Sequence, residues 1–175
     1  MNITLTLIAI LQLFGSVTLG VIILYLTYRI VSAVVGRKYP IKEDNTAFAI
    51  FVGAVMFSVG YLVSSVIQPL LSTFRTLSVG VNDTVSVLLQ FSKYLFLFVF
   101  ISTIIALGVN LIGTYLFNLF TRDVKELEEI SKNNVSVAII TGVIILIITL
   151  FARESVVLLL ESIVPYPGGG EIYNP

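Results

Sequence analysis

Four long apolar runs dominate this sequence and constrain what it can fold into. They extend over residues 3–35, 46–71, 87–120 and 134–152, and short polar connections separate them. A helix needs about 20 apolar residues to cross the roughly 30 Å hydrocarbon core of a bilayer. Each run approaches or exceeds that length, and little of the 175-residue chain remains for a soluble domain. The runs therefore predict an all-α polytopic membrane protein, with four transmembrane helices in a single domain over residues 1–175.

Composition agrees with lipid as the main environment. Only 11% of the residues are charged, whereas soluble domains average about 25%. The formal net charge is zero, so no overall field would attract nucleic acid. The chain has no His and no Cys, which removes the commonest metal ligands, the usual general base and the thiol nucleophile. We expect a protein that is not an enzyme, holds no metal or cofactor and has no nucleic-acid partner.

A nine-residue block occurs twice. It reads N-T-A-F-A-I-F-V-G over residues 45–53 and N-V-S-V-A-I-I-T-G over residues 134–142. Each half of the chain then holds two spans, so both halves insert with the same orientation, as parallel-repeat helical hairpins about an axis along the membrane normal. We place repeat 1 at about residues 4–74 and repeat 2 at about residues 87–164. The Pro- and Gly-rich residues 165–175 predict a flexible tail.

The repeated block is part of a motif that resembles a known family. The second copy reads E-x-I-x-x-x-N and then A-I-x-x-G, carried by Glu128, Ile130, Asn134, Ala138, Ile139 and Gly142. The first copy keeps Ile41, Asn45, Ala49, Ile50 and Gly53. This pattern is similar to the YjfL-like family, small prokaryotic four-span membrane proteins with a duplicated two-helix unit and a domain of unknown function. The resemblance implies a cytoplasmic-membrane location and supplies no catalytic residue.

Basic residues predict the orientation of the spans, because cytoplasmic loops carry an excess of Lys and Arg. Seven lie in or beside the connections at 36–45 and 121–134, and three lie at the opposite ends of the runs. The seven are Arg29, Arg37, Lys38, Lys42, Arg122, Lys125 and Lys132, and the three are Arg75, Lys93 and Arg153. Both connections are therefore expected in the cytoplasm and both termini outside. The first run has no Lys or Arg before it, so we interpret it as a retained span and not as a signal peptide.

Three asparagines are the main polar candidates. Asn45 and Asn134 precede the second and fourth runs, where their side chains can cap a helix or face a central axis and bind an ion or a polar head group. Asn110 falls near the middle of the third run. A polar residue at that depth either hydrogen-bonds a neighbouring helix or belongs to a conduction path.

Two pairs of small residues predict close helix packing, namely Ala49 with Gly53 and Ala138 with Gly142. Small residues four apart let helix backbones approach in lipid. The two pairs could meet around the repeat axis, or they could seat a neighbouring subunit.

Charged residues near the outer ends of the third and fourth runs predict an ion pair there. The candidates are Lys93, Arg153 and Glu154, and we expect Lys93 to bond Glu154 and so join the two spans.

The polar connections carry further expectations. Residues 72–86 predict a loop with at most one short helical or extended piece. Within it, Asn82 begins an N-D-T triplet, which is either a glycosylation acceptor or a solvated turn. Residues 121–133 favour a helical extension of the third span, whose acidic face is solvated or docks a partner; this face holds Glu126, Glu128 and Glu129.

Two functional classes fit these features. The first is a scaffold, anchor or accessory subunit that assembles in the bilayer with itself or with other membrane subunits. The second is an oligomeric channel or transporter for a small ion or solute, with a pore lined by Ser16, Thr18, Ser58, Thr103, Asn110 and Thr141. The runs hold no acidic residue at mid-span, although proton and ion relays usually need one, so the first class is favoured.

Overall fold

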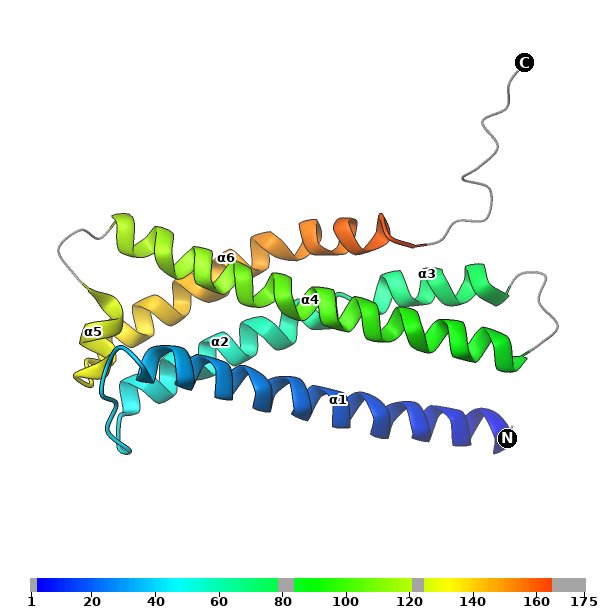
Figure 1. Cartoon of the computed structure of the whole chain (residues 1–175), viewed down its shortest axis with the longest axis horizontal. Coiled ribbons are helices and arrows are strands. Elements are labelled where there is room, and N and C mark those ends of the chain that lie inside the picture. Colours follow the sequence, from blue (N-terminus) through cyan, green and yellow to red (C-terminus); the bar gives the residue numbers. More distant parts are fainter. Residues whose placement is uncertain (1–2, 79–83, 121–124, 165–175) are drawn as a thin grey trace, which may run out of the picture.

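The computed structural model describes residues 3–78, 84–120 and 125–164, and every element within them is a helix. The order is α1 (Ile3–Gly36), α2 (Thr46–Ser64), α3 (Ile67–Ser78), α4 (Thr84–Phe120), α5 (Glu126–Ser131) and α6 (Val135–Glu161) (Figure 1). Four segments of these helices are long and apolar enough to cross a membrane: Val17–Gly36, Thr46–Leu77, Val85–Tyr115 and Val135–Glu161. The predicted all-helical class and the four candidate spans are thus confirmed.

The second span is broken near its outer end, and Pro69 explains the break. Proline has no N–H to bond the carbonyl four residues earlier, and its ring clashes with that carbonyl. Around this point the N–H groups of Ser65 and Val66 bond carbonyls only three residues back, at 3.1 Å each. Helix α3 then continues to Ser78. The segment 72–86, predicted as a loop with a short helical or extended piece, is helical at both ends, in α3 up to Ser78 and in α4 from Thr84.

The connection before α6 also differs from expectation. Helix α5 does not extend α4, because it starts afresh after Lys125, whose backbone is non-helical at φ −91° and ψ 87°. It packs against α6 and α2 instead, at one end of the bundle (Figure 1). Its first residue, Glu126, is buried, so the expected solvated face does not include it.

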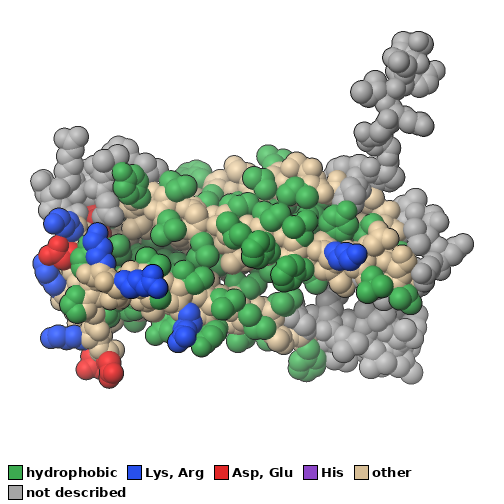
Figure 2. Space-filling view, viewed as in Figure 1, with side chains coloured by type: hydrophobic (Ala, Val, Ile, Leu, Met, Phe, Trp, Pro, Cys, Tyr) green, Lys and Arg blue, Asp and Glu red, His purple; other side chains and the backbone are tan. Residues whose placement is uncertain are grey.

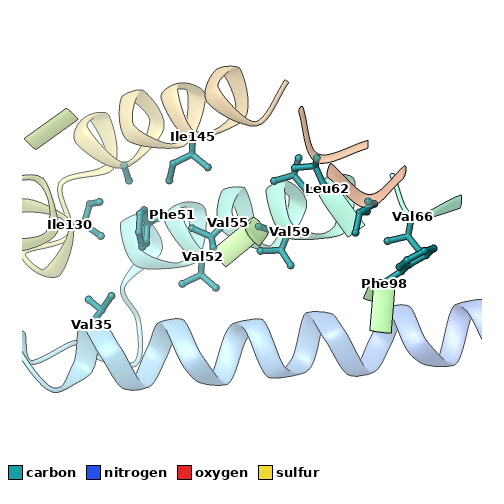
Figure 3. Packing of buried hydrophobic residues seen from close by; sticks show 14 of the residues in the cluster. Val35, Phe51, Val52, Val55, Val59, Leu62, Val66, Phe98, Ile130 and Ile145 are labelled. Carbon is teal, nitrogen blue, oxygen red and sulfur yellow. The ribbon is translucent and has the colours of Figure 1, made fainter. Parts of the chain in front are cut away.

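Helix α2 lies at the centre of the bundle. It packs along α6, and α4 lies against both of them. The main contact of α1 is with α2. The core cluster follows this arrangement, with Val52, Val55, Val59 and Leu62 of α2 all buried (Figure 3). A helix that is apolar on nearly every side is typical of a span enclosed by other helices.

The outer surface of the bundle is apolar too. Phe57, Phe96 and Phe151 of three different helices are 62%, 74% and 81% exposed. Figure 2 shows charged side chains gathered at the end that holds α5 and the α1–α2 connection, with a mostly uncharged face along the helices. An apolar surface of this extent suits hydrocarbon rather than water. The fold therefore supports a multi-pass membrane protein.

Candidate functional site

A chain of buried polar side chains joins three helices in the middle of the bundle. The Asn110 amide nitrogen on α4 lies 2.8 Å from Ser58 Oγ on α2. Ser58 Oγ lies 2.5 Å from Thr149 Oγ1 on α6. All three residues are at most 6% exposed. These three side chains thus connect α2 and α6 with α4, which lies against both.

The direction of each hydrogen bond in this chain follows from the partners at its two ends. Asn110 also bonds the Ala106 carbonyl at 2.7 Å, and a carbonyl can only accept, so the nitrogen must face it. Thr149 donates to the Ile145 carbonyl at 2.7 Å. Its single proton is then used, so Ser58 donates to Thr149 and accepts from Asn110. The acceptor left over is Asn110 Oδ1, which is buried with no hydrogen-bond partner.

This chain of polar side chains lies near the middle of the candidate spans formed by α2 and α6. Helices rise 1.5 Å per residue, so Ser58 is about 20 Å along the axis from Asn45 and Thr149 is about 22 Å from Asn134. Both distances are about half of the roughly 40–45 Å thickness of a bilayer with its head-group layers. Ser58 and Thr149 therefore lie near the middle of their candidate spans, and Asn110 is bonded to Ser58 at that level.

A second polar cluster lies at the end of the bundle that holds α5, with Asn45 as its centre. Asn45 Oδ1 accepts from the Phe48 N–H at 2.7 Å and caps α2. Its amide nitrogen donates to the carbonyls of Ile130 and Ser131 at 2.9 and 3.0 Å. The carbonyls at the end of a helix have no partners within that helix. One side chain therefore ties the start of α2 to the end of α5.

Asn134 caps α6 in the same way. Its Oδ1 accepts from the Val137 N–H at 3.3 Å, and its amide nitrogen donates to Glu129 at 3.1 Å. The two cap residues have nearly the same backbone conformation, φ −78° and ψ 93° at Asn45 against φ −77° and ψ 94° at Asn134. Both asparagines thus occupy the N-cap positions that the sequence suggests.

Sequence reasoning missed Asn133, which completes this cluster. Its φ is +67°, and its side-chain oxygen accepts from the Ala47 N–H at 3.0 Å. Asn is one of the few residues besides Gly that readily adopts this left-handed conformation after a helix. The signal was therefore present in the sequence, since Asn133 follows a short charged stretch and stands next to the cap candidate Asn134.

Helix α5 carries a compact charge network. Lys132 Nζ lies 2.9 Å from Glu128 and 3.2 Å from Glu129. The hydrogen bond from Lys132 holds the pKa of Glu128 below its ordinary value. At Glu129 the pKa is lowered first by the hydrogen bond from Asn134 and then by Lys132. The pKa of Lys132 is raised by the same two carboxylates, so the network favours the charged forms.

The two small-residue pairs occupy different environments. A Cβ on Gly142 would lie 3.2 Å from Ala54 Cβ on α2, whereas a Cβ on Gly53 would have no neighbour within 4 Å. Ala138 is buried and Ala49 is exposed. The idea that the two pairs meet each other was therefore wrong, because the α6 pair packs on a different face of α2. Sequence reasoning also missed Gly113, whose Cβ would lie 2.9 Å from Ile148.

The expected ion pair between α4 and α6 was wrong as well. Arg153 bonds its neighbour Glu154 at 2.9 Å, and its guanidinium lies 5.5 Å from the centre of the Tyr61 ring. Lys93 makes no ion pair within 4.0 Å among the described residues. Arg153 is therefore held against α2, and the cation on α4 stays separate.

The remaining pore candidates do not gather at one place. Thr18 and Thr103 bond carbonyls of their own helices at 2.8 and 2.7 Å, and Thr141 is buried with no partner for its hydroxyl. The side chain of Ser16, the residue Asn82 and the tail at 165–175 lie outside the described residues. Within the described residues, no group of His, Cys, Asp and Glu could hold a metal ion.

These features define a class: a multi-pass helical membrane protein whose spans are tied together by buried polar side chains. The match to a family model covers residues 3–156 and has the description Domain of Unknown Function (DUF350). The chain belongs to this family. No curated protein and no solved structure matches it.

Proposed function

We propose that this protein is a non-enzymatic scaffold, anchor or accessory subunit of a membrane complex. The observation that carries the proposal is the buried chain of Asn110, Ser58 and Thr149. These polar groups bond one another between helices, so they are used for packing rather than to line a passage. The long apolar faces that remain on the outside of the bundle offer surface for lipid, for a second copy or for other membrane subunits.

The orientation proposed from the basic residues places α5 and the α1–α2 connection in the cytoplasm, with both termini outside and the protein in the cell membrane. Because the chain has no Cys, single Cys variants give a clean test. A Cys at Lys42 should react with a membrane-impermeant maleimide only after the cells are opened, and a Cys at Ser162, an exposed residue at the far end of α6, should react in intact cells. The reverse labelling pattern would overturn this orientation.

Proteoliposomes test the functional proposal directly. A scaffold subunit should give no ion or solute flux above that of empty liposomes. Flux by the wild type that is lost in a folded Asn110→Leu variant would overturn the proposal and would establish a conduction role for Asn110.

The second candidate remains an oligomeric channel or transporter. Asn110 Oδ1 and Thr141 Oγ1 are buried without a hydrogen-bond partner, and buried polar atoms in lipid often belong to pathways. The same flux assay decides this alternative, since it requires conduction by the wild type.

We also infer that the two hairpins arose by duplication of one two-helix unit. The matched backbone conformation of the Asn45 and Asn134 caps supports this inference. The different environments of Gly53 and Gly142 imply that the two copies have since diverged in how they pack.

A further inference from the structure

The half of α4 far from α5 carries a shallow hollow of about 360 Å³. Gln90, Lys93, Tyr94 and Leu97 line it. Residues at this spacing lie on one face of a helix. The hollow therefore presents an ammonium group, an amide and a phenol side by side, with an apolar side chain next to them.

Lys93 brings a positive charge to this hollow that no carboxylate among the described residues pairs within 4.0 Å. The side chain is exposed. Of the other two cations toward this end, Arg75 and Arg153, the second is already engaged by Glu154. An anion from outside the chain would therefore meet Lys93 without having to displace a protein carboxylate.

Helix geometry places the hollow at the level of lipid head groups. Lys93 is 17 residues from Asn110 along α4, or about 26 Å, and Asn110 is level with Ser58, about 20 Å from the Asn45 cap. The two lengths add to about 45 Å along the helix axes. For helices tilted by about 20° this corresponds to roughly 42 Å along the membrane normal. A bilayer with both head-group layers is about 40–45 Å thick. If the cap lies at one membrane surface, Lys93 lies at the other.

We propose that Lys93, Gln90 and Tyr94 bind the phosphate group of an anionic phospholipid. Lys93 supplies the charge as a compact phosphate binder, and the Gln90 amide and the Tyr94 hydroxyl supply further donors. The Tyr94 ring lies 6.0 Å from the Phe98 ring, which positions it, and Leu97 contacts the start of an acyl chain. This site is independent of the proposed scaffold role, because it needs no protein partner.

Native mass spectrometry of the full chain in a non-ionic detergent tests the site. Phosphatidylglycerol and phosphatidylcholine compete for the wild type, K93Q, K93R and K42Q. Lys42 is a matched control because it is exposed, has no ion pair in the described part of the chain and lies at the opposite end. We expect phosphatidylglycerol preference in the wild type, K93R and K42Q, and a loss of about fivefold in K93Q. Equal preference in K93Q and the wild type would overturn the proposal, and circular dichroism checks that each variant is folded.

Inorganic phosphate distinguishes the two sources of the ligand. Retention of phosphatidylglycerol in millimolar phosphate supports a lipid ligand. Its displacement by phosphate from the wild type, with no such effect in K93Q, would show that the same side chains take free phosphate and would overturn the lipid assignment. Neither result bears on the scaffold proposal, because the assay measures the binding of lipid and not of protein partners.

Discussion

Ser58 is the residue on which the buried polar chain depends, so Ser58→Ala should destabilise the bundle more than Asn110→Leu. The substitution removes two bonds between helices, from Asn110 at 2.8 Å and to Thr149 at 2.5 Å. Bonds of this kind average about 0.6 kcal/mol each in membranes. Ser58→Ala also leaves one Asn110 N–H buried and unpaired, at a cost of about 1 kcal/mol or more. The free energy of unfolding should fall by about 2 kcal/mol.

Asn110→Leu should have a much smaller effect. It removes one bond between helices, worth about 0.6 kcal/mol. It also removes the buried Oδ1 that has no partner, which recovers about 1 kcal/mol. The two effects nearly cancel, so the change in unfolding free energy should stay within about 0.5 kcal/mol.

Reversible unfolding in mixed micelles with rising SDS, followed by circular dichroism, measures both changes. Ser64→Ala is the matched control, because Ser64 is exposed and its hydroxyl bonds the Tyr61 carbonyl of its own helix. The double variant of Ser58 and Asn110 should show a coupling of about 0.6–1.7 kcal/mol. A loss at Ser58 no larger than at Ser64, or additive effects in the double variant, would refute the directed hydrogen-bond chain.

Three further predictions concern the rest of the fold. Asn45→Ala should cost about 1–2 kcal/mol more in unfolding free energy than Asn134→Ala, because besides a cap it removes two bonds to main-chain carbonyls of α5, whereas Asn134 makes one part-buried bond to the Glu129 side chain; the same SDS titration compares them, and equal losses would contradict the stronger tie at Asn45. Gly142→Ala should destabilise the α2–α6 contact, whereas Gly53→Ala should be neutral or raise stability by up to about 1 kcal/mol, as melting temperatures in detergent would show; equal effects would argue against the packing described. The pKa of Glu129 is lowered in the folded state from an ordinary value of 4.5, so its contribution is present above pH 4.5 and is lost as the pH falls through the folded-state pKa. The protection of amides at the start of α6, measured by hydrogen exchange relative to the intrinsic rate at each pH, should therefore fall in that acidic window in the wild type and fall less in Glu129→Gln.

Run length and cap chemistry were enough to predict the four spans and the start of two of them. An apolar stretch of this length has few alternatives in lipid, and Asn45 and Asn134 stand directly before such stretches. The break in the second span has a local cause. Proline acts on the carbonyl four residues earlier, so the break that Pro69 produces falls at Ser65.

The side-chain partners could not be predicted, because they depend on how each helix is rotated about its axis. Gly53 and Gly142 share the same local sequence, yet only Gly142 faces a neighbouring helix. Lys93 and Glu154 both lie toward the end of the bundle away from α5, but the rotation of α6 holds Arg153 against Tyr61 and pairs it with Glu154. The second role of Asn45, at the carbonyls of α5, likewise required the tertiary structure.

The proposed scaffold role is tested most directly by the mass and content of the complex that mild detergent releases from the native membrane. We predict that this chain is recovered in fixed stoichiometry with other membrane proteins, and that these partners stay bound through size-exclusion chromatography and native mass spectrometry. A bare monomer would contradict it. A homo-oligomer of this chain alone that also conducts ions in liposomes would contradict it as well and would favour the channel.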